Sequence, residues 1–214
     1  MNEKVNSYLS DLMQSSDPVL LELEKDATKR HVPIIGPQVA RTISILLRSA
    51  RPERALEIGT ATGYSGICIA RALQGKDKKL ITIEADPNRV KEARRNFQKA
   101  EVSDFVEILQ GDAKEIVPHV SEKNRGNFDI VFLDVGEKTL YVELFKYCVS
   151  ALRVGGFLIA DNTLWNGAVA VKKDNSPETT AIRKFNRLVF SDKRLDAAIV
   201  PMRDGFTVAL KIEE

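Results

Sequence analysis

The sequence predicts an α/β protein with a doubly wound, mostly parallel seven-stranded sheet, a C-terminal antiparallel hairpin and an N-terminal helical cap. Three observations lead to this fold class. Short apolar runs alternate with helical patterns from residue 55 onward, an Asp-Gly pair joins the last two strand-like runs, and three helical stretches precede the first run. Nearly continuous apolar strands separated by helices are typical of a parallel sheet that is covered on both faces.

Five of the strands are short runs rich in Ile, Val, Leu and Phe. Each is followed by a helical pattern, as a chain of strand–helix–strand units requires. The predicted strands cover residues 55–58, 79–84, 105–110, 128–134 and 156–161. The helices that follow them begin near Ser65, Pro87, Ala113, Lys138 and Pro177, and the last one ends at residue 191.

The two ends of the chain depart from this alternation. The last two runs, LDAAIVPM and FTVALKI, are joined by Arg203, Asp204 and Gly205, and an Asp-Gly pair between strands favours a hairpin turn. Asp17-Pro18 and the loop HVPIIGP divide the N-terminal part into three helical stretches. These predicted helices cover residues 3–14, 18–30 and 37–49, and we expect them to cap the sheet.

The length and charge of the chain limit its organisation and its partners. A chain of 214 residues suits one sizeable core, which predicts a single domain over residues 1–214, with the cap in 1–50 and a Rossmann-like core in 51–214. Its 32 basic and 30 acidic side chains leave a net charge of only +2. This balance carries no electrostatic signature of an obligate nucleic-acid binder, although it does not exclude one.

The sequence predicts a cytoplasmic protein with no membrane partner. The opening residues MNEKVNSYLSDLMQ lack the apolar segment and cleavage site of a signal peptide, and no apolar run approaches the roughly 18 residues of a membrane helix. Cys68 and Cys148 both lie in apolar helical contexts, which suggests packing roles in a reducing compartment.

The stretch ALEIGTATGYSG places a glycine turn directly after the first strand. Ligands of open α/β sheets bind outside the carboxyl ends of the strands, so this turn is the expected binding place. A dinucleotide site would need a glycine where Ala61 stands, which argues against a nicotinamide-dependent oxidoreductase. Glu57 lies ahead of Gly59 and Gly63, and its carboxylate suits an ammonium group, while Ser65 and nearby amides could hold a carboxylate.

The next two strand ends add ligands of the same type. Glu84 ends the second strand, where a carboxylate can take both hydroxyls of a ribose. The third strand is followed by Gly-Asp-Ala, where Asp112, beside Ala113, could meet an adenine amino group. For Asp112 alone, capping of the next helix explains the residue equally well. An amino-acid group, a ribose and an adenine without phosphates describe S-adenosylmethionine.

Strands four and five end in Asp134 and in Asp161-Asn162. Neighbouring parallel strands bring these side chains together beside the expected methyl donor. Two carboxylates and an amide oxygen, without His or Cys, favour a hard cation such as Mg²⁺. Such a cation could chelate two adjacent oxygens of a substrate and orient one of them toward the methyl group.

The chain resembles the cation-dependent O-methyltransferases related to catechol and caffeoyl-coenzyme A O-methyltransferases, a class I S-adenosylmethionine-dependent family. The matching stretches are LEIGTATGYS, IEADP, FDIVFLD, ADNTLWNG and RDGFTVALK, in this order, and they cover the chain from about residue 30 to its end. The resemblance implies that Asp134, Asp161 and Asn162 hold the metal. It also implies cofactor contacts for Ile35, Glu57, Gly59, Ser65, Glu84 and Asp112.

One loop departs from the family pattern. Family members usually carry a Lys three residues after the first metal Asp, whereas DVGEKTLY places Lys138 four residues after Asp134 and keeps Tyr141 three residues later. The resemblance makes Lys138 a candidate general base, and a solvated first-turn lysine is an equally good interpretation. Trp165 opens the long connection after the fifth strand, which we expect to wall the acceptor site together with Tyr141.

The leading hypothesis is metal-assisted methyl transfer from S-adenosylmethionine to one hydroxyl of a vicinal pair on a small aromatic substrate. An alternative acceptor is a hydroxylated wobble uridine in tRNA, because KRHVPI at residues 29–34 resembles a loop of bacterial tRNA 5-hydroxyuridine methyltransferases. A catalytically inactive S-adenosylmethionine-binding module is a further alternative, given the altered DVGEK loop. The resemblance also implies a homodimer to which the N-terminal helices contribute.

Overall fold

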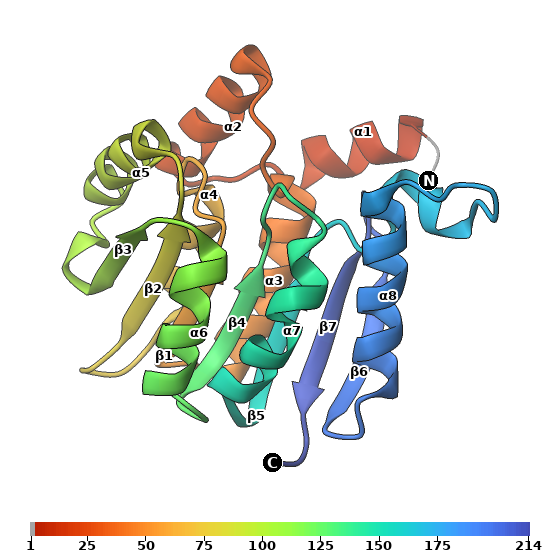
Figure 1. Cartoon of the computed structure of the whole chain (residues 1–214). Coiled ribbons are helices and arrows are strands. Elements are labelled where there is room, and N and C mark those ends of the chain that lie inside the picture. The colour runs from red at the N-terminus through yellow and green to blue at the C-terminus, as the bar shows by residue number, and fades with distance from the viewer. Residues whose placement is uncertain (1–2) are drawn as a thin grey trace.

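The computed structural model describes residues 3–214, so the first two residues of the predicted domain lie outside it. It contains a seven-stranded sheet of order β3-β2-β1-β4-β5-β7-β6, flanked by helices on both faces (Figure 1). The first five strands pair in parallel, and β7 runs antiparallel to both β5 and β6. The predicted fold class and C-terminal hairpin are therefore confirmed. The strands are β1 Arg54–Ile58, β2 Lys79–Glu84, β3 Val106–Gln110, β4 Phe128–Leu133, β5 Leu152–Ala160, β6 Leu195–Val200 and β7 Phe206–Lys211.

Local capping chemistry sets several helix starts. Asp17 and Asp86 accept hydrogen bonds from backbone amides at the starts of α2 and α5, each of which has proline in its first turn. No helix within residues 3–214 is long and apolar enough to cross a membrane. The helices are α1 Glu3–Leu12, α2 Pro18–Arg30, α3 Gly36–Ala50, α4 Tyr64–Ala72, α5 Pro87–Lys99, α6 Ala113–Lys123, α7 Leu140–Ala151 and α8 Pro177–Ser191, with short 3₁₀ segments η1 Ser103–Phe105 and η2 Trp165–Ala170.

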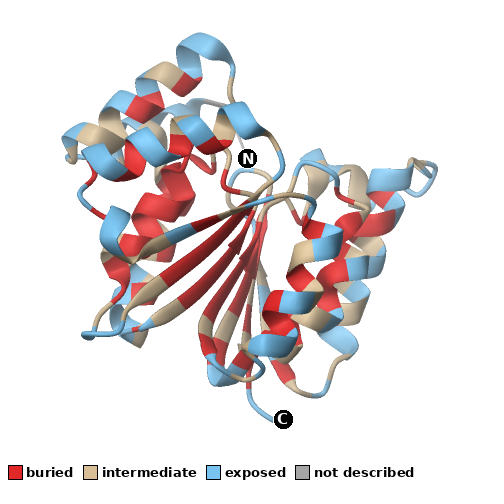
Figure 2. Cartoon of the chain, turned by 60° about the vertical axis from the view of Figure 1, so that its left-hand side comes forward, coloured by how far each residue is buried: buried red, intermediate tan, exposed pale blue. Residues whose placement is uncertain are grey.

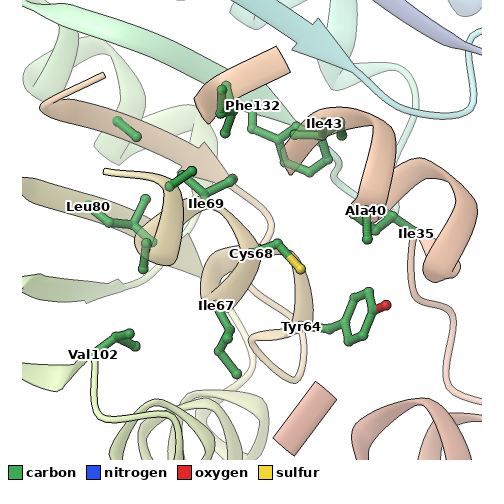
Figure 3. Close-up of a cluster of buried hydrophobic side chains, with 14 of the residues drawn as sticks. Ile35, Ala40, Ile43, Tyr64, Ile67, Cys68, Ile69, Leu80, Val102 and Phe132 are labelled. Atoms are coloured by element: carbon green, nitrogen blue, oxygen red, sulfur yellow. The ribbon is translucent and has the colours of Figure 1, made fainter. Parts of the chain in front are cut away.

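The sheet separates two apolar layers, and Figure 2 shows its strands largely buried between them. Alternate strand residues face opposite layers, as the period of two requires. Leu56 and Ile58 pack with α6, α7 and α8, whereas Ala55 packs with α3, α4 and α5. Figure 3 shows part of the layer formed by α3, α4 and α5, where Ile35 and Ile43 lie near α4.

The three N-terminal helices divide into two groups. Figure 1 shows α1 and α2 beyond the carboxyl ends of the parallel strands, as the predicted cap requires. The third helix, α3, instead packs on the sheet, because its Ile43 and Leu47 belong to the same apolar cluster as Phe132 and Phe206. Its strongly amphipathic sequence therefore serves the core of the sheet.

Strand β5 is longer than expected. It begins at Leu152, which pairs with Phe128, and the register then shifts before Phe157 pairs with Ile130. Gly155 lies in this irregular stretch with φ +80°. The apolar pattern predicts only the regular part after the glycines, because a register shift leaves no periodic signal.

Candidate functional site

The carboxyl ends of β1, β4 and β5 are in register, so the residues that follow them lie side by side. Ile58 is opposite Leu133, and Leu133 is opposite Ala160. The amide of Asp134 donates to the Ile58 carbonyl at 2.9 Å, and the amide of Asp161 donates to the Leu133 carbonyl at 3.1 Å. The sheet thus brings the two predicted metal carboxylates to adjacent positions on one edge.

The glycine turn lies against this edge. Gly59 has φ +104°, and a Cβ added there would be 2.1 Å from the Asp134 carbonyl oxygen. Gly63 has φ +88°, and a Cβ there would be 3.1 Å from the ring of Phe97. Ala61, at the position where a dinucleotide site has glycine, also has a positive φ of 46°. The turn therefore needs glycine at Gly59 both for its backbone conformation and for its contact with β4.

Glu57 lies beneath this turn with no exposed surface. Its two carboxylate oxygens accept hydrogen bonds from Ser65 Oγ at 2.5 Å and Thr82 Oγ1 at 2.6 Å. Because the Thr82 proton is used in this way, Thr60, whose hydroxyl is 2.6 Å from that of Thr82, must be the donor of that pair. Burial raises the pKa of Glu57 to about 7, although both hydroxyl hydrogen bonds oppose the shift.

This raised pKa predicts a pH-dependent stability that Glu57→Gln should remove. The protonated carboxyl favours the folded state at low pH, and this contribution is lost as pH rises from about 4.5 through about 7. We expect the wild type to lose stability relative to Glu57→Gln by on the order of 1 kcal/mol or more between pH 5 and 8. Urea unfolding of both proteins across this range measures the difference, and parallel curves would contradict the prediction.

The other predicted cofactor residues are placed around the turn. Glu84 accepts from the backbone amides of Ala61 at 2.8 Å and Asp86 at 3.0 Å, and so fastens the turn to the end of β2. Asp112 is exposed and caps α6 through the Lys114 amide at 2.8 Å. Ala113 is buried in the layer of α6, and Ile35 is buried at the start of α3 (Figure 3). Their contacts with a cofactor stay predictions.

Asp134 and Asp161 lie at adjacent strand ends with little exposed surface. The Asp134 side chain is 24% exposed, and Asp161 is 6% exposed. Burial and the charge of Asp134 raise the pKa of Asp161 to about 7. Burial also raises the pKa of Asp134, and the ammonium of Lys138 opposes this shift. The pair therefore needs positive charge beside it to be fully ionised.

Lys138 supplies such a charge. Its side chain is 4% exposed, and its Nζ donates to Asn162 Oδ1 at 2.8 Å and reaches Asp134 Oδ1 at 3.4 Å. Tyr141 is fully buried beneath it, with its hydroxyl 2.8 Å from Nζ and 3.0 Å from the Asp161 carbonyl oxygen. The interactions seen for Tyr141 are therefore internal, and its contact with a substrate and the role of Lys138 as a base stay predictions.

The connection after β5 adopts an unusual backbone. Asn162 and Trp165 have φ values of 58° and 48°, which place both in the left-handed region. Trp165 is half-buried, and its ring centroid is 5.9 Å from Lys138 Nζ. The ring therefore lies near the Lys138 ammonium, which contacts Asp134 and Asn162.

The turn between β6 and β7 supports this connection, a role that the hairpin pattern alone does not predict. The amides of Thr163 and Leu164 donate to the carbonyls of Gly205 and Asp204, both at 2.9 Å. The exposed Arg203 donates to the Ile34 carbonyl at 2.9 Å, and its charge opposes the burial that raises the pKa values of Asp134 and Asp161. The stretch RDGF is part of a family-like motif, so the sequence marks this turn as important. It does not predict which way the Arg203 side chain points.

The site's donor set fits a hard cation. Among residues 3–214 there is no group of three or more His, Cys, Asp or Glu side chains that could hold a metal. The oxygens at this edge that could hold a cation are those of Asp134, Asp161 and Asn162, two carboxylates and an amide. This oxygen-only set suits Mg²⁺. Burial raises the pKa of both aspartates, so a bound cation would favour their ionised forms.

Comparisons with known proteins give the family. The family model described as "O-methyltransferase" matches residues 10–212. A catechol O-methyltransferase of Niastella koreensis is 32% identical, over 97% of this chain and 96% of the relative. A caffeoyl-CoA O-methyltransferase of Stellaria longipes is 27% identical, over 99% of this chain and 91% of the relative.

A solved structure agrees with these relatives. The O-methyltransferase TomG of Streptomyces achromogenes, in complex with SAM, has a TM-score of 0.87 and 28% identity, and the match covers 98% of this chain and 96% of that one. The family predicted from the motifs is thereby confirmed. The chain belongs to the O-methyltransferase family, the S-adenosylmethionine-dependent enzymes that its sequence predicts.

Proposed function

We propose that this enzyme transfers the methyl group of S-adenosylmethionine to one hydroxyl of a vicinal pair on a small aromatic substrate, with a divalent cation such as Mg²⁺ as cofactor. The observation that carries the proposal is the gathering of Asp134, Asp161 and Asn162 at the sheet edge beside the glycine turn. The relatives named catechol and caffeoyl-CoA O-methyltransferases support the aromatic substrate class.

The donor would occupy the glycine turn. The carboxylate of Glu57 lies behind Ser65, so the amino group of the methionine moiety would interact with this pair at the start of α4. Glu84 lies at the end of β2, where its oxygens would be shared between backbone amides and a ribose. Asp112 and Ala113 follow β3 and would border the adenine.

Methyl transfer forms one carbon–oxygen bond and breaks one carbon–sulfur bond, and the electrons of the broken bond remain on sulfur. The sulfonium charge is thereby lost, and the acceptor hydroxyl would give up its proton to solvent water. A bound divalent cation would lower the pKa of that hydroxyl. Trp165 would limit the acceptor to a planar ring beside the carboxylates. Lys138 could accept the proton only as a neutral amine, whereas its present contacts are those of an ammonium.

The proposal is tested by S-adenosylhomocysteine release with 3,4-dihydroxybenzoate as acceptor. We expect turnover with Mg²⁺ and a loss of at least about 100-fold with excess chelator, because one cation must both bind and activate the hydroxyl. 4-Hydroxybenzoate, whose single hydroxyl has no adjacent oxygen with which to chelate a cation, is the matched control and should be inactive. Turnover that persists with chelator would contradict the metal, and equal turnover of both acids would contradict the vicinal pair.

Assembly and location remain part of the proposal. We propose a homodimer to which α1 contributes, because Val5, Tyr8 and Leu12 on this helix are 44%, 64% and 65% exposed at helical spacing. A cytoplasmic location is supported by Cys68 and Cys148, which are free and buried.

A further inference from the structure

Lys138 lies among the oxygens that are expected to bind the cation. Its Nζ is 2.8 Å from Asn162 Oδ1 and 3.4 Å from Asp134 Oδ1, atoms of two different strand ends. It is also 2.9 Å from the Val135 carbonyl oxygen and 2.8 Å from the Tyr141 hydroxyl. Four acceptors surround a group with three N–H donors, so the ammonium is fully satisfied within the protein.

The loop between Asp134 and Lys138 carries the lysine into this cluster. The residues between Asp134 and Lys138 include Gly136, beside which a Cβ would meet nothing within 4 Å, and the exposed Glu137. The loop folds back so that Lys138 enters the cluster with its side chain 4% exposed. Burying an ammonium is costly unless charge and hydrogen bonds compensate it, and here two of the four compensating oxygens belong to predicted metal ligands.

A divalent cation and this ammonium would compete for the same oxygens. Asn162 offers a single amide oxygen. If the Lys138 ammonium donated to this oxygen while a divalent cation coordinated it, the two positive charges would repel each other strongly in a site of low exposure. We propose that the Lys138 ammonium is the resident cation of the metal-free site, and that a divalent cation binds by displacing it from Asn162. This inference rests on the proposed metal dependence.

The test is the affinity for Mn²⁺, measured by calorimetry without acceptor. Lys138→Met removes the charge and keeps the aliphatic stem, and Lys114→Met is the matched control, because Lys114 is 44% exposed and lies 3.7 Å from Glu137 rather than in the cluster. We expect Lys138→Met to bind Mn²⁺ at least about tenfold more tightly than wild type, and Lys114→Met to be unchanged.

Weaker or unchanged Mn²⁺ binding by Lys138→Met would overturn the inference. If Lys138 only positions Asn162 for the metal, Lys138→Met should bind Mn²⁺ more weakly, and an unchanged affinity would equally exclude competition. In both cases wild type still binds the metal, so the proposed function stands. If neither wild type nor variant binds Mn²⁺, the metal dependence itself fails and the competition fails with it.

A measurement on the wild type covers the case in which the variant does not fold. Buried, hydrogen-bonded ammonium groups exchange slowly enough for their ¹⁵Nζ signals to be seen, and Lys211 provides a reference, because it is 3% exposed and bonded to the Leu152 carbonyl at 2.8 Å. We expect Mg²⁺ to shift or broaden the signal of Lys138 and to leave that of Lys211 unchanged. Two unchanged signals under saturating Mg²⁺ would overturn the displacement.

Discussion

Asp161→Asn should almost abolish methyl transfer and yet stabilise the metal-free protein. The substitution keeps an oxygen at the end of β5 but removes one of the two charges that would hold the cation. We therefore expect kcat/KM to fall by about 100-fold or more. We also expect the free energy of unfolding in chelator at pH 8 to rise by about 1–2 kcal/mol, as is common when a functional group is sacrificed.

The stability gain follows from the pKa of Asp161, which burial and Asp134 raise to about 7. The protonated carboxyl favours the folded state below its ordinary pKa, and this contribution is lost as pH rises through 7. Asparagine does not titrate, so the difference between the two proteins should grow with pH. Urea unfolding in chelator measures it, with the exposed Asp196→Asn on β6 as control. A variant less stable than wild type at pH 8 would show that the Asp161 charge is compensated.

Gly59→Ala should lower the free energy of unfolding more than Glu57→Gln, Asp161→Asn or Gly136→Ala. The residue has φ +104°, and its new Cβ would lie 2.1 Å from the Asp134 carbonyl oxygen, a backbone atom that cannot rotate away. We expect a loss of about 3 kcal/mol or more. Activity should also fall, because separating β1 from β4 displaces the glycine turn and Asp134 together.

Gly136→Ala is the control for this prediction. A Cβ at Gly136 meets nothing within 4 Å, although the residue lies only two positions beyond Asp134. Its unfolding free energy should therefore stay within about 0.5 kcal/mol of wild type. Chemical denaturation of both variants measures the contrast, and equal stabilities would mean that the chain relaxes at Gly59 without strain.

The order of elements was predictable because its signals are local. Apolar runs mark the five parallel strands, Asp17-Pro18 and Pro87 mark helix starts, and Asp-Gly marks the hairpin. The candidate residues were predictable in part for the same reason, since a polar residue directly after an apolar strand must lie at the carboxyl edge of the sheet. Thr82 was not predicted, because a threonine within a strand carries no sign that it bonds to Glu57.

The sequence by itself thus determined the fold class, the family and the row of acidic residues at the strand ends. Only the tertiary structure decided how these residues are used. It shows that Asp112 caps α6, that Tyr141 is enclosed, that the turn at Arg203 supports the connection after β5, and that Lys138 contacts Asp134 and Asn162. The physical reason is that burial and hydrogen-bond partners depend on segments far apart in the chain, which become neighbours only when the sheet brings the strand ends together.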